Sequence, residues 1–217
     1  MLPDAESFRR LVDGRATGLV ATLGRTGLSA IEIPYEALVR LRNYGYDHSI
    51  LTVKKASAPV ISVGNLTLGG TGKTPLTIKL FDIIKRMGFD VITAKKFYSN
   101  QIDEQNLLKA KTKSIVSKRR MDAINQAVNN SNQVIIFDDG LQEKKINYDL
   151  KIVCFKKKNW IGNGQLIPSG PLREKIVNLK NYDAVFLNGK DHNSNEIRET
   201  IYKLNPKIEI FETKYLP

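Results

Sequence analysis

The sequence has little cysteine and histidine, and it lacks any long apolar run. Its one cysteine, Cys154, excludes a disulfide framework and fits a reducing cytosol. Cys154 lies in the apolar run 152–155, which favours a buried, unreactive thiol. A transmembrane helix needs about 18 consecutive apolar residues, and no such run occurs. The N-terminus also lacks a signal-peptide pattern, so we expect neither a membrane-spanning nor a secreted protein.

Charge is present in excess, with a net charge of +12 over 217 residues. Such a basic protein attracts nucleic acid, anionic lipid surfaces and phosphorylated ligands alike. Much of the excess is lysine spread through the chain, as at Lys109, Lys111 and Lys118, so an ordinary solvated surface is the alternative. Because no recognition helix or aromatic stacking platform is visible, we expect no nucleic-acid partner.

The composition changes near residue 57. Residues 1–57 contain six Arg and two Lys, whereas residues 58–217 contain five Arg and 21 Lys. We therefore predict an N-terminal helical segment over 1–57 and a phosphate-loop kinase domain over 58–217. The pattern of Tyr35, Leu38 and Leu41 predicts a helix within 31–44, which either lies on a membrane surface or packs on the sheet domain.

Short apolar runs alternate with helical patterns after Pro59. The alternation is typical of an α/β protein of the P-loop NTPase type, with a mainly parallel sheet and helices on both faces. Strands are predicted at 60–63, 90–94, 133–137, 150–155, 184–187 and 208–211, and helices from 76 and at 104–112, 118–129 and 195–204.

A glycine-rich loop joins the first strand to the first helix of this domain. Backbone N–H groups in such a loop, together with the helix N-terminus, bind an anion. Lys73 can reach the β- and γ-phosphates of a nucleotide, and the Thr74 hydroxyl can bind Mg²⁺. The strict pattern has Gly where Thr67 stands. The predicted nucleotide-binding residues are Thr67, Leu68, Gly69, Gly70, Thr71, Gly72, Lys73 and Thr74.

Two further motifs follow. Asp138 and Asp139 end an apolar strand, where a carboxylate can hold Mg²⁺ beside the phosphate loop, although a pair of acidic turn residues is the alternative. The loop 162–174 is rich in Gly and Pro, and its Arg173 could bind a phosphate with two hydrogen bonds. On its own, this loop could equally be a set of turns.

These motifs closely resemble those of the tetraacyldisaccharide 4′-kinases, which phosphorylate a lipid-linked glucosamine disaccharide in lipid A synthesis. The resemblance rests on Val60 to Pro75, on Asp138-Asp139-Gly140-Leu141-Gln142 and on Gly162 to Glu174. It implies a peripheral kinase that uses ATP and Mg²⁺ at the cytoplasmic face of the inner membrane. It also implies that Asp103 acts as general base, that Asp138 and Thr74 hold the metal, that Asp139 supports the site and that Arg173 clamps phosphate or substrate.

The chain departs from the family pattern in several places. The family's Ser-Arg-Gly-Tyr is replaced by Lys95-Lys96-Phe97-Tyr98, and Glu143 stands where a His is usual. The family also has a C-terminal domain beyond the position of Pro217, so a separate chain supplying that domain is one expectation. A non-catalytic or partner-dependent ATP-binding fragment and a P-loop ATPase acting on nucleic acid are therefore the alternative functions.

Overall fold

The computed structural model describes residues 18, 34, 37–46, 48, 50–189 and 194–214. A helix at 37–46 precedes the sheet domain. Two 3₁₀ helices, η1 (Ser99–Gln101) and η2 (Ile176–Asn181), accompany four α-helices of that domain, α3 (Lys73–Arg86), α4 (Ile102–Lys111), α5 (Arg120–Asn129) and α6 (Asn195–Leu204). The strands are β1 (Val60–Gly64), β2 (Val91–Lys96), β3 (Ser114–Ser117), β4 (Val134–Asp138), β5 (Leu150–Lys156), β6 (Ala184–Asn188) and β7 (Glu209–Thr213).

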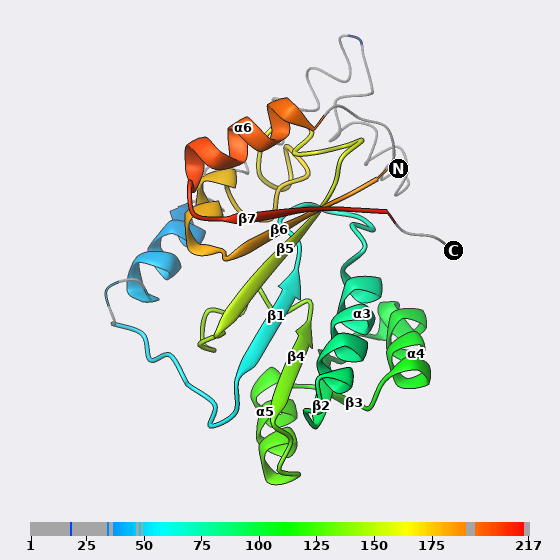
Figure 1. Cartoon of the computed structure of the whole chain (residues 1–217). Helices are drawn as coiled ribbons and strands as arrows, with labels where there is room; N and C mark the ends of the chain where they lie inside the picture. Colours follow the sequence, from blue (N-terminus) through cyan, green and yellow to red (C-terminus); the bar gives the residue numbers. More distant parts are fainter. Residues whose placement is uncertain are drawn as a thin grey trace.

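The seven strands form one sheet in the order β3-β2-β4-β1-β5-β6-β7, as Figure 1 shows. All six neighbouring pairs are parallel, which confirms the predicted α/β class. Strand β1 lies in the middle, between β4 and β5. Because parallel strands place their carboxyl ends at one edge, the loops after β1, β2, β4, β5 and β6 gather at that edge.

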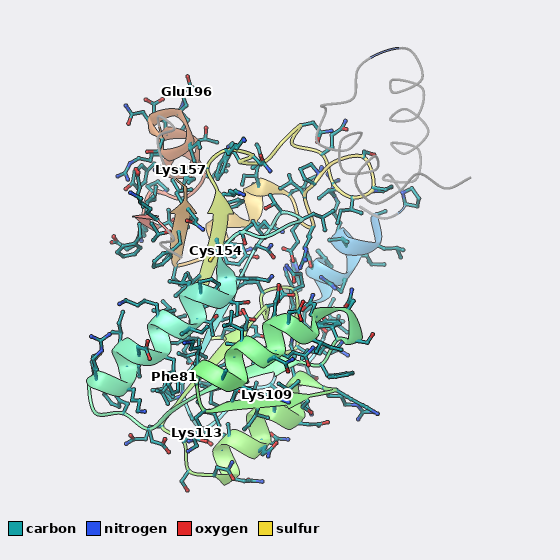
Figure 2. The ribbon with its side chains drawn as sticks, turned by 90° about the vertical axis from the view of Figure 1, so that its right-hand side faces the viewer. Phe81, Lys109, Lys113, Cys154, Lys157 and Glu196 are labelled. Carbon is teal, nitrogen blue, oxygen red and sulfur yellow. The ribbon has the colours of Figure 1, made fainter. Side chains whose placement is uncertain are left out.

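Helices α3 and α4 cover one face of the sheet (Figure 1). Leu76, Leu80 and Ile84 recur at helical spacing along α3 and pack against the sheet. Phe81 of α3 and Cys154 of β5, both labelled in Figure 2, belong to the same apolar cluster. Each is at most 5% exposed, so α3 is fixed firmly beneath the glycine loop that precedes it.

The other face carries α5, η2 and α6. Alternation along the strands separates the two layers, because Ile152 and Cys154 face α3 whereas Val153 and Phe155 face the opposite layer. There Val153 and Phe155 join Leu179 of η2 and Ile201 of α6 in a second cluster. Helix α5 closes the remaining part of this face through a third cluster with β2 and β4.

The strand β3 was not predicted from the sequence. It has only four residues and begins and ends in serine, so it has no apolar run to mark it. Helix α4 begins at Ile102 rather than 104, and β7 ends at Thr213 rather than 211. The predicted helix over 31–44 lies partly outside the described residues, and the described helix occupies 37–46. Among the described residues, no helix has the length and apolar character needed to span a bilayer.

Candidate active site

The glycine loop follows the strand β1 and ends at the first turn of α3. Gly69 and Gly72 have φ values of 106° and 89°, which side chains other than hydrogen adopt only with strain. The Asn65 amide braces the loop by donating to the carbonyl oxygens of Thr67 at 2.8 Å and Gly69 at 3.3 Å. The Thr71 hydroxyl is buried, and within the described part of the chain it has no hydrogen-bond partner. The loop thus holds backbone N–H groups and a hydroxyl in a fixed shape suited to an anion.

Asp138, at the end of β4, is buried directly behind the glycine loop. Its side chain has no solvent exposure, and its Oδ2 accepts a hydrogen bond from the Thr74 hydroxyl at 3.1 Å. The Thr77 hydroxyl donates to Oδ1 at 3.3 Å. The structure therefore brings together the two predicted metal-binding residues, Thr74 and Asp138.

A second charged group meets Asp138 from the neighbouring strand. Lys95 of β2 is only 1% exposed, and its Nζ lies 2.6 Å from Asp138 Oδ2 and 2.7 Å from Glu104 Oε2. The other Glu104 oxygen lies 3.7 Å from Lys73 Nζ. Two lysines and two carboxylates thus alternate in one connected cluster, Lys73-Glu104-Lys95-Asp138.

The ionisation of this cluster reflects burial and pairing together. Burial opposes the charge on Lys95, but the charge of Asp138 and hydrogen bonds to Asp138 and Glu104 outweigh it and raise the pKa of Lys95. Burial likewise opposes the charge on Glu104, yet the hydrogen bond from Lys95 and the charge of Lys73 leave the pKa of Glu104 lowered. Burial raises the pKa of Asp138, and the charge of Lys95 acts against that rise. Lys95 and Glu104 are therefore charged at neutral pH.

Asp139 adopts a left-handed conformation, with φ of 61°, at the turn after β4. Its N–H donates to the Val63 carbonyl at 2.8 Å, and its own carbonyl accepts from Arg120 at 2.8 Å. The Asp139 carboxylate lies 3.4 Å from Arg173 Nη1. These contacts fix a strained turn, which is a common feature of functional sites.

The loop 162–174 runs beside the glycine loop. Leu68 donates its N–H to the Pro171 carbonyl at 2.8 Å, and Arg173 donates its N–H to the Leu66 carbonyl at 2.7 Å. A Cβ at Gly170 would lie 2.2 Å from the Gln165 carbonyl oxygen, so only glycine fits there. The third sequence motif is therefore a built support for the phosphate loop, and it brings the Arg173 side chain to Asp139.

A pocket of about 450 Å³ opens along this edge of the sheet. The glycine loop lines one part of it, and the ends of β5 and β6 line another through Lys156 and Asn188. The Asn188 amide stands close to the glycine loop, since a Cβ at Gly72 would lie 2.5 Å from its nitrogen. The full lining consists of Gly70, Thr71, Gly72, Lys73, Thr74, Pro75, Glu104, Leu107, Lys156, Asn188, Gly189 and Lys214.

Asp103 lies in the first turn of α4, where it is exposed. Its carboxylate makes no hydrogen bond or ion pair with the described residues, and it does not line the pocket. Its neighbour Glu104 does line the pocket, and sequence reasoning missed that residue together with Lys95 and Asn188. Adjacent residues on a helix point about 100° apart, so a shift of one position decides which carboxylate enters the site.

A family model and curated relatives both match this chain, and they name the same kind of kinase. The model of a family described as tetraacyldisaccharide-1-P 4′-kinase matches residues 25–102 and 98–215. A tetraacyldisaccharide 4′-kinase of Pelagibacter ubique is 50% identical over 157 residues, which cover 72% of this chain and 50% of that protein. One from Vibrio vulnificus is 31% identical over 186 residues, which cover 77% of this chain and 56% of that protein. The chain spans about half the length of these curated relatives.

Solved structures agree on the fold. The crystal structure of LpxK from Aquifex aeolicus, in complex with ATP, superposes with a TM-score of 0.68 at 24% identity, covering 88% of this chain and 81% of that chain. The cell division protein FtsY of Thermotoga maritima gives 0.53 at 18% identity, covering 76% of this chain and 64% of that chain. The family match runs through all three sequence motifs and through the residues that line the pocket, and the chain therefore belongs to the tetraacyldisaccharide-1-P 4′-kinase family.

Proposed function

We propose that this chain binds ATP and transfers the γ-phosphate to the 4′-hydroxyl of a tetraacyl glucosamine disaccharide. The observation that carries the proposal is the contact of Thr74 with Asp138 behind a glycine loop that ends in Lys73, in a chain of this kinase family. Relatives named tetraacyldisaccharide 4′-kinase and an ATP complex of the Aquifex protein support the same nucleotide and acceptor.

The glycine loop is the proposed site of the triphosphate. Its N–H groups and the Thr71 hydroxyl donate to the phosphate oxygens, and Lys73 neutralises charge on the β- and γ-phosphates. Lys73 is 6% exposed and lies 3.7 Å from Glu104, so its ammonium is already held at the pocket wall. The nucleoside extends along the pocket toward Lys156, Asn188 and Lys214.

Thr74 and Asp138 are the proposed ligands of Mg²⁺. A hydroxyl and a carboxylate are the hard oxygen donors that Mg²⁺ prefers, and they already lie 3.1 Å apart. No group of three or more His, Cys, Asp or Glu able to hold a metal occurs in the described part of the chain. Phosphate oxygens and water would complete the coordination, which is usual for Mg²⁺ in kinases. A bound Mg²⁺ would neutralise charge that develops between the β- and γ-phosphates.

Asp103 is the proposed general base for the acceptor hydroxyl. Its carboxylate is exposed at the start of α4, beside Glu104 of the pocket wall, and it is not held by an ion pair with any described residue. Glu104 is a weaker candidate because its carboxylate is occupied by Lys95 and Lys73. Asp103 would accept the proton of the 4′-hydroxyl as the phosphoryl group arrives. Arg173 and Asp139 would orient the phosphate or the acceptor.

The proposed location is the cytoplasmic face of the inner membrane. Leu38, Leu41 and Tyr44 of the helix at 37–46 are spaced three residues apart, so they share one helical face. They are 68%, 70% and 54% exposed, and Arg40 and Arg42 lie on the same helix. An exposed apolar face beside arginine is the pattern of a helix that lies on an anionic membrane surface.

A second candidate is an ATP-binding chain that transfers phosphate only with a further domain or partner chain. The described residues include the proposed nucleotide site, and the chain spans about half the length of the curated relatives. Nucleotide binding without transfer would favour this candidate.

A kinase assay tests the proposal. Purified protein, labelled ATP, Mg²⁺ and the tetraacyl disaccharide 1-phosphate are combined in detergent, and phosphate in the lipid product is measured. We expect transfer by the native chain and a loss of about 100-fold or more in Lys73→Ala, because that change removes a positioned charge from the phosphates. Lys113→Ala, at an exposed ion pair, should behave as the native chain. ATP binding with no transfer, even with the C-terminal domain of a relative added, would disprove catalysis.

A further inference from the structure

Lys95 is a charged residue that lies at a buried position of strand β2, after four uncharged residues. It follows Val91, Ile92, Thr93 and Ala94 in a strand whose first five residues are all buried. A lysine with 1% exposure is costly unless carboxylates surround its ammonium. Here Asp138 and Glu104 lie 2.6 Å and 2.7 Å from Nζ, and they come from a different strand and from α4. Three separate elements therefore place this charge.

The Lys95 ammonium lies beside the groups that meet the nucleotide. The same oxygen, Asp138 Oδ2, accepts from both Lys95 and the Thr74 hydroxyl. Glu104 uses one oxygen for Lys95 and the other for Lys73. The ammonium is therefore two contacts away from Lys73 on one side and shares an oxygen with Thr74 on the other.

We propose that Lys95 is a built-in counter-charge of the nucleotide site, which lowers the dependence of nucleotide binding on Mg²⁺. The inference rests on the proposed ATP binding but not on phosphate transfer. Without a divalent cation, a triphosphate in the glycine loop would face Asp138 and Glu104, and Lys95 neutralises part of that repulsion. Charges a few ångströms apart in such a site change a binding constant by about tenfold or more.

Lys95 also acts in the opposite sense when the cation is present. A cation at Thr74 and Asp138 would approach a carboxylate that Lys95 has already neutralised, and it would meet a like charge. Lys95 thus strengthens metal-free binding and weakens the added effect of Mg²⁺. Both effects lower the same quantity, the ratio of the nucleotide dissociation constant in EDTA to that in Mg²⁺.

The test measures this ratio with a fluorescent ATP analogue. We expect the ratio to rise by about tenfold in Lys95→Met, whose side chain has a similar length but no charge. Lys95→Gln also removes the charge, but its amide can still donate hydrogen bonds to the carboxylates and so help the protein to fold. We expect a similar rise of the ratio in this variant, which would show that the effect comes from the lost charge and not from misfolding. Lys113→Met, which removes an exposed lysine labelled in Figure 2, should leave the ratio unchanged.

Two results would overturn the proposal. One is an unchanged ratio in folded Lys95→Gln, with folding checked by thermal denaturation. The other needs no variant. If the native protein binds the analogue more than about 100-fold more weakly in EDTA than in Mg²⁺, then Lys95 does not replace the charge of the metal. No binding in either buffer would instead refute the proposed ATP site, and binding without kinase activity would refute only the transfer step.

Discussion

Single buried polar residues set the geometry of the nucleotide edge. Asp138 accepts hydrogen bonds on both oxygens, from Thr74 and Lys95 on Oδ2 and from Thr77 on Oδ1. A buried carboxylate without such donors is strongly unfavourable, because it loses its hydration without compensation. The position of Asp138 therefore depends on α3 and β2 as much as on its own strand.

Thr77 offers a direct test of that dependence. Thr77→Val keeps the shape of a side chain with no exposure but removes the hydrogen bond to Asp138 Oδ1. We expect the free energy of unfolding to fall by about 1 kcal/mol, measured by urea denaturation. Thr200→Val, which removes a hydrogen bond within the surface helix α6, should change it by less than about 0.5 kcal/mol. Equal effects of the two variants would contradict the role given to Thr77.

Cys154 allows a measurement of burial in the core. Burial, with a contribution from the Asp138 charge, raises the pKa of its thiol from 9.0 to about 12, and only the thiolate reacts readily. We expect iodoacetamide to leave Cys154 unmodified in the folded protein at pH 8 and to alkylate it completely in denaturant. Mass spectrometry measures the alkylated fraction. Because the folded thiol has the raised pKa, its stabilising contribution is complete below pH 9.0 and falls as the pH rises toward 12. Rapid labelling of the folded protein at pH 8 would exclude this environment.

At the scale of elements, the sequence revealed the strands with continuous apolar runs and missed the one without. Strands β4 and β5 were predicted because apolar residues fill both of their faces. Strand β3 was missed because a four-residue edge strand has too few apolar residues to show a period. The helix boundaries differ by about two residues, as is common where no capping side chain marks the start.

The helix at 37–46 has a surface that can be tested by itself. We expect Leu38→Ser combined with Leu41→Ser to weaken binding to vesicles containing anionic phospholipid by about tenfold or more, because each exposed leucine would otherwise bury its side chain in the lipid. Sedimentation with the vesicles measures the bound fraction. Met87→Ser is the matched control, since Met87 is 66% exposed at the end of α3. Unchanged binding in the double variant would remove the support for a membrane-surface helix.

At the scale of the whole molecule, the site is an assembly of distant segments. The glycine loop and Asp138 were predicted because each follows a recognisable strand. Lys95 and Glu104 were not, because the pairing of Lys95 with Asp138 joins positions 43 residues apart and depends on the order of strands in the sheet. Glu104 in turn belongs to the site through its ion pairs with Lys95 and Lys73. The contact of Arg173 with Asp139 could not be predicted either, since it depends on how the loop 162–174 returns along the glycine loop.

Nucleotide binding should stabilise this assembly as a unit. At a ligand concentration of about 100 times the dissociation constant, binding adds about 2.7 kcal/mol to the free energy of unfolding. For a chain of this size, that corresponds to a rise of about 5–10 °C in the melting temperature. Differential scanning fluorimetry with ATP measures the shift. Lys73→Ala should melt near the native temperature without ATP and show little shift with it. If ATP raised the melting temperature of that variant as much as that of the native protein, the nucleotide would have to bind at another site.

The central place of β1 also has a consequence for synthesis of the chain on the ribosome. Residues 60–64 lead into the glycine loop, but their neighbours in the sheet are residues 135–138 and 150–153, which emerge much later. A nascent chain that has reached only α4 therefore has the complete phosphate-binding sequence and no sheet to hold it. Such long-range pairing is slow to form and leaves apolar strands uncovered meanwhile. The nascent chain thus becomes able to bind nucleotide only late in its synthesis, even though the sequence responsible for binding is made early.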